Sequence, residues 1–465
     1  MRTAKETSDD LVKEKDRFKL PHSSLSRSKW LGNMFWLYAL QGLNYLVPLA
    51  VLPYLIRVLG VERYGLVAFA QAFAQYFVLI TDYGFNLSAT KRIAQDRASR
   101  ESVSVLFWSV MFIKCVLFTV GAAILTILLF AVPRIHAHPE VYVISYFIVL
   151  GSVLFPVWLF QGMEQMRFIS VVTGGAKVLS AVLLVIFVHQ SSDYLLAAGI
   201  LAGGMLLAGV VGFCIALAHF KIALHLPTRA ACWQTLFDGW HLFVSAGGAS
   251  LYANTGVFLV GLVAGNLQAG YFSVAEKTVR GIQGLLAPIT QAVYPHVSAL
   301  AAKSRELALD FIAKSLAWIG VLSLVPSVFL LLFARPITLF LFGNGAEGSV
   351  VPVRWAAMLP FVIAISSVLG VQTMIPFGLE KQLSRIYVAA GLSSLVPLVV
   401  AIHYWGATGA AAAILTVEVV VCFAMCIVLS GCGVHLRVGV RQQRISSIET
   451  GTQISRIYGH ESSSD

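Results

Sequence analysis

Three charged residues interrupt one long apolar run and could bind an anion there. Glu276, Lys277 and Arg280 lie within residues 270–300. On a helix Glu276 and Arg280 are i, i+4 neighbours that can pair, whereas Lys277 lies about 100° away and could keep its charge available. If this run crosses a membrane, such charges favour a bundle interior or a wet cavity, which predicts a cationic cavity wall. The alternative is the outer end of a helix, with side chains reaching the interface.

Three further bases could contribute to the same kind of site. Lys114 and Lys177 are isolated within apolar runs, and Lys177 follows two glycines that would let another helix approach closely. Arg92 follows Lys91 at the end of another run, where ordinary anchoring by cytoplasmic basic residues is the favoured explanation of the pair. The candidate substrate-binding bases are therefore Lys277, Arg280, Lys177, Lys114 and Arg92.

Three carboxylates within or beside apolar runs could carry a coupling proton or sodium ion. Glu418 is the best candidate for a protonatable group, because burial without a partner disfavours its charged form. A hydrogen bond to a neighbouring helix is the alternative. Asp82 could cap the following turn instead, and Glu276 could pair with Arg280.

No pattern in the chain predicts an enzyme or a resident cofactor. There is no G-x-S-x-G, P-loop or H-E-x-x-H sequence, so we expect no catalytic residue and no ATP-driven transport by this chain. His136, His138 and Glu140 form a spacing too common to predict a metal site. None of the six cysteines lies in a C-x-x-C motif, and we expect no metal or redox role for them.

The elements that must position these residues are apolar helices. The 465 residues are 58% hydrophobic and 12% charged, about half the charge of a soluble domain. Twelve apolar stretches are long enough to cross a hydrocarbon core of roughly 30 Å as helices. They lie near 31–56, 64–86, 104–132, 141–161, 170–188, 194–218, 238–262, 270–300, 311–333, 351–374, 383–403 and 407–431.

The distribution of basic residues orients these helices. With the N-terminus inside, 23 of the 33 Lys and Arg residues lie in inside segments and 5 in outside loops. This asymmetry predicts both termini in the cytoplasm. It also explains the net charge of +11 by basic residues in cytoplasmic loops, rather than by binding of nucleic acid. The start of the chain reads as a cytosolic tail and a signal anchor, not a cleaved signal peptide. The predicted organisation is a basic cytoplasmic tail (1–30), a six-helix lobe (31–218), a cytoplasmic linker (219–237), a second six-helix lobe (238–431) and a basic, Ser-rich cytoplasmic tail (432–465).

A weak internal repeat supports two halves. Gly60, Gly65 and Ala70 recur 205 residues later as Gly265, Gly270 and Ala275. An offset of six helices preserves orientation, so the fold class is an all-α integral membrane protein of twelve transmembrane helices in two lobes related by a parallel pseudo-two-fold repeat. Prolines mark bending points, either as static kinks or as moving hinges. The hinge candidates are Pro48, Pro53, Pro288 and Pro295.

The first hundred residues carry a family resemblance. The segments "GLNYLVPLAVLPYLIRVLG" and "YGLVAFAQAFAQYFVLITDYGFNLSAT", and later "AGYFSVAEK", resemble Wzx-type O-antigen flippases, in the polysaccharide-biosynthesis branch of the multidrug/oligosaccharidyl-lipid/polysaccharide exporters. The charged N-terminal tail is longer than that family pattern.

The resemblance implies a flippase of the bacterial inner membrane. It would move an undecaprenyl-diphosphate-linked oligosaccharide from the cytoplasmic to the periplasmic leaflet by alternating access, with the lipid bilayer and possible polymerase machinery as partners. A multidrug cation antiporter of the same superfamily is one alternative, although the bases outnumber the acids within the runs. A polysaccharide polymerase is another, although no large outside loop is present for glycosyl chemistry.

Overall fold

The computed structural model describes residues 42, 47–97 and 99–434, and these ranges are built from helices. The predicted tails at 1–30 and beyond 434, and the start of the first predicted span, lie outside them. The principal helices are Val47–Leu59, α3 (Val61–Asp82), α4 (Phe85–Gln95), α5 (Arg100–Ala131), α6 (Pro133–His136), α7 (Pro139–Leu154), α8 (Val157–Gly162), α9 (Met166–Phe187), α10 (Tyr194–Phe220), α11 (Arg229–Ala264), α12 (Asn266–Lys303), α13 (Arg305–Leu332), α14 (Ala334–Phe342), α15 (Val350–Ala356), α16 (Leu359–Ser367) and α17 (Glu380–Gly431).

Apolar surface identifies the helices as membrane-spanning. Within the described residues, eight helical segments are long and apolar enough to cross a bilayer. The side chains of Phe130 and Ile127 on α5 are 77% and 65% exposed, as expected for a surface that contacts lipid. One of the eight, α17, covers the two predicted spans 383–403 and 407–431, and its backbone breaks at Gly406 (φ 55°, ψ −132°).

The predicted helix 141–161 is divided into α7 and α8, and α4 lies largely in the predicted inside segment 87–103. The chain bends between α3 and α4 at Tyr83 and Gly84, which both have left-handed backbone conformations. Between α7 and α8 it bends at Phe155 and Pro156, because proline has no N–H for a helical hydrogen bond. The two short segments beyond the bends pack together, and Thr90 on α4 donates a hydrogen bond of 3.1 Å to the Trp158 carbonyl on α8.

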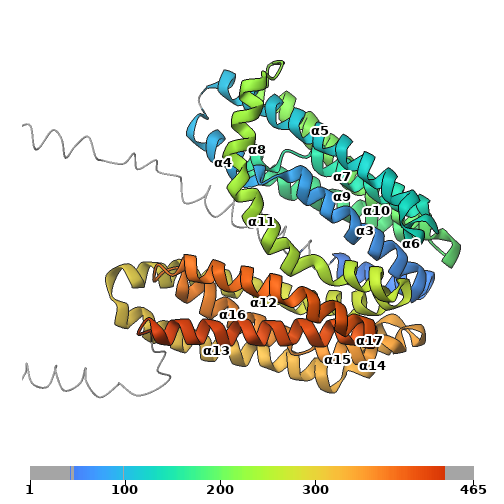
Figure 1. The fold of residues 1–465 in the computed structure, drawn as a ribbon, viewed down its shortest axis with the longest axis vertical. Helices are drawn as coiled ribbons and strands as arrows, with labels where there is room; N and C mark the ends of the chain where they lie inside the picture. The colour runs from blue at the N-terminus through green and yellow to red at the C-terminus, as the bar shows by residue number, and fades with distance from the viewer. Residues whose placement is uncertain (1–41, 43–46, 98, 435–465) are drawn as a thin grey trace, which may run out of the picture.

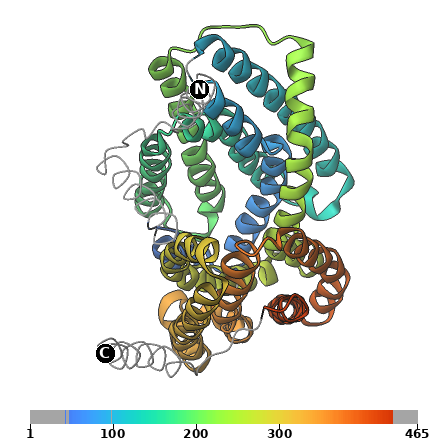
Figure 2. The same ribbon diagram turned by 90° about the vertical axis from the view of Figure 1, so that its left-hand side faces the viewer.

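The helices form two groups. The helix α11 begins beside the first group, and its C-terminal part packs against α12 and α17 in the second. Figure 1 shows α3–α10 in one group and α12–α17 in the other, and Figure 2 shows the same division after a 90° turn. The groups converge at the end that holds α6 and α14, here called the closed end, and their ribbons diverge toward α4 (Figure 1). One large apolar core cluster contains residues of both groups, such as Phe69 and Val274, whereas the core around Trp158 belongs to the first group alone.

A pair of glycines permits a close backbone contact between the groups. A Cβ atom at Gly65 on α3 would clash with the Asn266 carbonyl, and a Cβ atom at Gly270 on α12 would clash with the Val61 carbonyl. Because Val61 and Gly65 lie 205 residues before Asn266 and Gly270, each helix uses equivalent positions against the other. Backbone contact of this kind requires glycine on both helices.

Candidate functional site

Two lysines from different helix groups interact electrostatically. Lys177 lies on α9 in the first group and Lys277 on α12 in the second, and the positive charge of Lys277 acts on the Lys177 ammonium. Lys177 is exposed and Lys277 is half-buried. Two like charges held near one another favour an anion between them, and a dianion most strongly.

The predicted i, i+4 pair on α12 is present beside Lys277. Arg280 Nη2 lies 2.8 Å from Glu276 Oε1, and the two side chains are 42% and 18% exposed. Glu276 also interacts electrostatically with Tyr64 on α3. The α12–α9 site, defined as Lys177, Glu276, Lys277 and Arg280, therefore contains three basic residues and one acidic residue.

Packing explains why these side chains of α12 are not enclosed in the apolar core. Phe272, Val274 and Ala275 of the same helix are buried in the core, and so are Thr278 and Val279. Glu276, Lys277 and Arg280 are less buried than these neighbours. On α9, Ala176 and Ser180 are buried while Lys177 is exposed. An amphipathic helix buries its apolar stripe and leaves its charged stripe accessible.

Lys114 lies in a different environment, inside the first group. Its side chain is 2% exposed, and its Nζ donates to Asp82 Oδ1 and to the Ser152 carbonyl, both at 2.9 Å. The Ser152 hydroxyl donates to the same carboxylate oxygen at 3.3 Å. The structure thus joins two residues that the sequence suggested for separate roles, a substrate-binding base and a coupling carboxylate. Their cluster lies beside both helix bends, since Asp82 ends α3 and Ser152 lies three residues before the α7–α8 bend.

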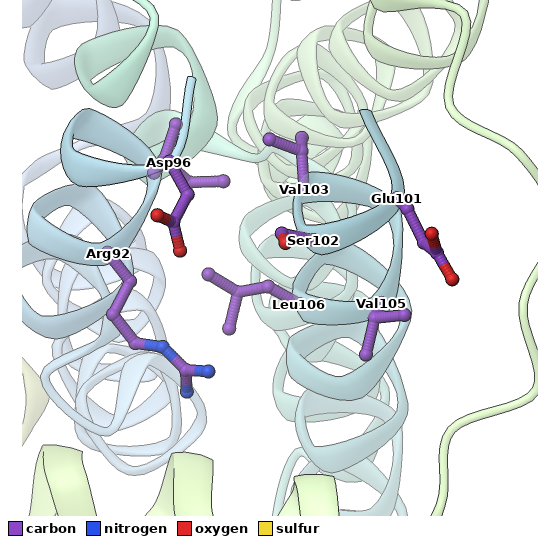
Figure 3. Close-up of a pocket in the computed structure, with 8 residues that line it drawn as sticks. Arg92, Asp96, Glu101, Ser102, Val103, Val105 and Leu106 are labelled. Carbon is purple, nitrogen blue, oxygen red and sulfur yellow. The ribbon is translucent and has the colours of Figure 1, made fainter. Parts of the chain in front are cut away.

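Arg92 lines a separate pocket at the α4 end of the first group. This pocket has a volume of about 300 Å³, lies between α4 and α5, and contains Asp96 and Glu101 as well. Figure 3 shows Arg92 and Asp96 on one wall and Leu106 on the other, with Glu101 directed away. Arg92 Nη1 also lies 3.4 Å from Asp238 Oδ2 on α11. No residue of α9 or α12 lines this pocket, so Arg92 does not share a site with Lys277.

Glu418 lies in the core of the second group. It is 8% exposed on α17 and interacts electrostatically with Tyr387 and Cys422. The neighbouring π-helical turn at Val368–Met374 carries Gln372, which is 1% exposed. Glu418 is therefore a buried carboxyl in a polar part of an apolar bundle.

The four proline hinge candidates lie in two helices. Pro48 and Pro53 lie in the helix Val47–Leu59, and α12 continues as a helix through Pro288 and Pro295. Motion at these prolines remains a prediction. The structure shows backbone breaks at other positions, such as Tyr83–Gly84, Phe155–Pro156 and Gly406.

A cluster of aromatic residues between the groups was not predicted. Phe69, Phe73 and Tyr76 on α3 surround Phe258 of α11, with ring centroids 5.9, 6.0 and 4.8 Å from that ring. The Tyr76 hydroxyl donates to Thr255 Oγ1 at 3.0 Å. The only signal in the sequence is the helical spacing of the three α3 aromatics, which core packing produces equally well.

The described residues contain no group of three His, Cys, Asp or Glu side chains able to hold a metal ion. The six cysteines are free.

Comparisons with known proteins assign the chain to a family. The model of a family described as "Polysaccharide biosynthesis protein" matches residues 30–301. A protein of Escherichia coli (strain K12) named "Putative O-antigen transporter" is 34% identical over 394 residues, covering 84% of this chain and 94% of that protein. The chain belongs to the polysaccharide biosynthesis protein family.

Solved structures share its fold. A structure of "Lipid II flippase MurJ, inward closed conformation" has a TM-score of 0.68 at 11% identity, covering 86% of this chain and 87% of that one. An inward-facing multidrug resistance MATE transporter of the MOP superfamily has a TM-score of 0.64 at 15% identity, and the match covers 84% of this chain and 95% of that one. The all-helical membrane fold expected from the sequence is confirmed by this similarity.

Proposed function

We propose that this member of the family is a flippase that moves a lipid-linked oligosaccharide across the bacterial inner membrane. The substrate is an undecaprenyl-diphosphate-linked unit of O-antigen or a related polysaccharide, and it moves from the cytoplasmic to the periplasmic leaflet by alternating access. The observation that carries the proposal is the α12–α9 site, where a base of the first helix group lies within electrostatic range of a base of the second. The relative named an O-antigen transporter supports the substrate class.

The chemistry of the site suits a diphosphate. Each unpaired hydroxyl of a sugar headgroup costs several kcal/mol to remove from water, and an unpaired phosphate charge costs far more. Lys177, Lys277 and Arg280 would replace the hydration of the diphosphate, because Arg and Lys make strong charge-assisted hydrogen bonds to phosphate. The lipid tail would stay in the bilayer between the two groups. We assign Lys114 and Arg92 to contacts that stabilise the first group rather than to substrate binding.

The proposed architecture has twelve transmembrane helices in two six-helix lobes related by a parallel repeat, with both termini in the cytoplasm. The reciprocal contact of Gly65 and Gly270 supports the repeat, since it uses equivalent positions on α3 and α12. The excess of basic residues in the predicted inside segments supports the orientation. With this orientation the closed end lies on the periplasmic side, and the helix groups diverge toward the cytoplasm (Figure 1).

The membrane potential favours the loaded step. Outward movement of two negative charges is favoured by an inside-negative potential at roughly 2.3 kcal/mol per charge per 100 mV. We propose that Glu418 carries a proton or sodium ion when the empty carrier resets, because a buried ionisable group within a membrane span is typically functional. Asp82 and Glu276 are weaker candidates, since each is paired with a base. A polysaccharide polymerase would then use the exported units.

The multidrug antiporter alternative predicts a different site. An organic cation would require acidic and aromatic groups, whereas the α12–α9 site has three bases and one acid. Export of ethidium by the reconstituted chain, unaffected by Lys277→Ala, would favour that alternative.

Flipping in proteoliposomes tests the proposal. The purified full chain would be reconstituted with a polyprenyl-diphosphate-linked oligosaccharide whose sugar is accessible to a lectin only in the outer leaflet. We expect rapid loss of lectin protection with the native chain and an approximately tenfold slower rate for Lys177→Ala/Lys277→Ala.

Lys314→Ala provides the matched control, because Lys314 is exposed on α13 and pairs with Asp310 of the same helix. Native flipping in the double variant would remove the α12–α9 site from the mechanism. Equal flipping with and without ion gradients would exclude obligatory coupling through Glu418.

A further inference from the structure

One arginine of the first helix group binds the end of a helix in the second. Arg134 on α6 donates from Nη1 to the Gly261 carbonyl at 3.0 Å and also to the Leu262 carbonyl. Because α11 ends at Ala264, these carbonyls are among the last four, which have no partner within the helix. The negative end of the helix dipole further favours a cation at this position.

A second arginine makes an equivalent contact. Arg57, at the end of the helix Val47–Leu59, donates from Nη2 to the Phe340 carbonyl near the end of α14. Both capped helices are followed by a glycine of nearly the same conformation: Gly265 has φ 95° and ψ 176°, and Gly343 has φ 83° and ψ 175°. The two contacts therefore share donor type, acceptor type and local backbone geometry.

The internal repeat relates the two contacts to each other. The position 205 residues after Arg57 is Leu262, whose carbonyl accepts a hydrogen bond from Arg134. The position 205 residues after Ile135, the neighbour of Arg134, is Phe340, whose carbonyl accepts from Arg57. The contacts thus occupy equivalent places on the two sides of the Gly65–Gly270 crossing. The helix Val47–Leu59 is bonded to the first group, since the Tyr54 hydroxyl donates to the Val188 carbonyl at the end of α9. In both contacts an arginine on the first-group side therefore donates to a carbonyl of the second group.

We propose that Arg57 and Arg134 form a two-point latch that holds the two helix groups together at the closed end, and that both contacts must break before the site can open there. The proposal rests on the alternating access of the proposed function. A charge-assisted hydrogen bond to a helix terminus is strong enough to shift the equilibrium toward the state that is closed at this end, and weak enough to break in each transport cycle. Backbone carbonyls also make the latch insensitive to the side chains that the second group carries there.

Distances between spin labels test the latch without any substrate. In a background lacking the native cysteines, one label pair would be placed at exposed Ala137 and Asn344 across the closed end. A second pair at exposed Glu101 and Lys303 would report on the opposite end. For Arg57→Ala/Arg134→Ala we expect a longer distance population at the closed end and a shorter one at the opposite end, with roughly a tenfold rise in the ratio of the two states.

Arg63→Ala is the matched control. This arginine is exposed at the same end, but its guanidinium lies 4.8 Å from the Tyr194 ring within the first group. We expect native distances in this variant. Arg57→Lys, which keeps a positive charge, should give an intermediate distribution and provides a milder variant if the double substitution folds poorly.

Unchanged distances in both Arg57→Ala/Arg134→Ala and Arg57→Lys would overturn the latch. Equal shifts in Arg63→Ala would also overturn it, because the effect would then be a general loss of positive charge. Because the measurement needs no substrate, a shifted distribution in a chain that flips no lipid-linked oligosaccharide would support the latch and reject the proposed substrate.

Discussion

Lys114 and Lys277 are both lysines within apolar helices, but their surroundings differ. Lys114 is enclosed by a single helix group, where its ammonium contacts the Asp82 carboxylate and the Ser152 carbonyl. Lys277 is half-buried on α12, and its positive charge acts on Lys177 of the other group. A base that is satisfied within one group keeps its partners when the groups move, whereas a base between the groups changes its neighbours. Lys114 should therefore govern stability, and Lys277 should govern transport.

Removing the enclosed lysine should have the largest effect. Lys114→Ala leaves the Asp82 carboxylate without its cation in a largely buried site, which should lower the free energy of unfolding by about 3 kcal/mol. Chemical denaturation of the purified protein in detergent measures this loss. The double variant Asp82→Asn/Lys114→Met should recover most of the stability, because no uncompensated charge remains. A double variant as unstable as Lys114→Ala would show that the ion pair is not the cause.

Removing the lysine between the groups should leave stability nearly unchanged and reduce transport. For Lys277→Ala we expect a flipping rate about threefold lower, equivalent to roughly 0.65 kcal/mol, with an unfolding free energy within about 0.5 kcal/mol of the native value. Parallel flipping and denaturation measurements on one preparation separate the two effects. A large loss of stability would mean that Lys277, like Lys114, stabilises the fold, and would contradict the proposed difference between the two lysines.

An exposed ion pair at the α4 end should have the smallest effect. Arg97 Nη2 lies 2.8 Å from Glu164 Oε1, but the side chains are 39% and 51% exposed. Solvent screens such a pair, so Arg97→Ala should change the unfolding free energy by less than about 0.5 kcal/mol and leave flipping unchanged. A loss comparable to that of Lys114→Ala would show that the α4 end depends on surface charge.

The sequence predicted the membrane helices well because their apolar length is a property of the chain itself. The ranges 104–132, 170–188 and 311–333 lie within α5, α9 and α13, apart from single residues at some helix ends. The helix breaks were harder to predict, since Gly84 and Pro156 permit a bend but do not require one. Pro288 shows the converse, because α12 continues as a helix through it.

The site was predictable only in part. The pairing of Glu276 with Arg280 follows from helical spacing and is confirmed. The pairing of Lys114 with Asp82, and the electrostatic effect of Lys277 on Lys177, depend on how distant helices pack, and no local pattern encodes that packing. The sequence did not predict the contacts of Arg57 and Arg134 for a related reason: their acceptors are backbone carbonyls, which every residue has.

Binding of a polyprenyl diphosphate and of the matching monophosphate to the purified chain tests the central claim most directly. The measurement compares their Kd values for the native chain and for Lys177→Met/Lys277→Met, with Lys314→Met as the control. If the two lysines hold the diphosphate between the helix groups, the native chain and the control should prefer the diphosphate by about tenfold, and the double variant should lose that preference. An undiminished preference in the double variant would contradict the account.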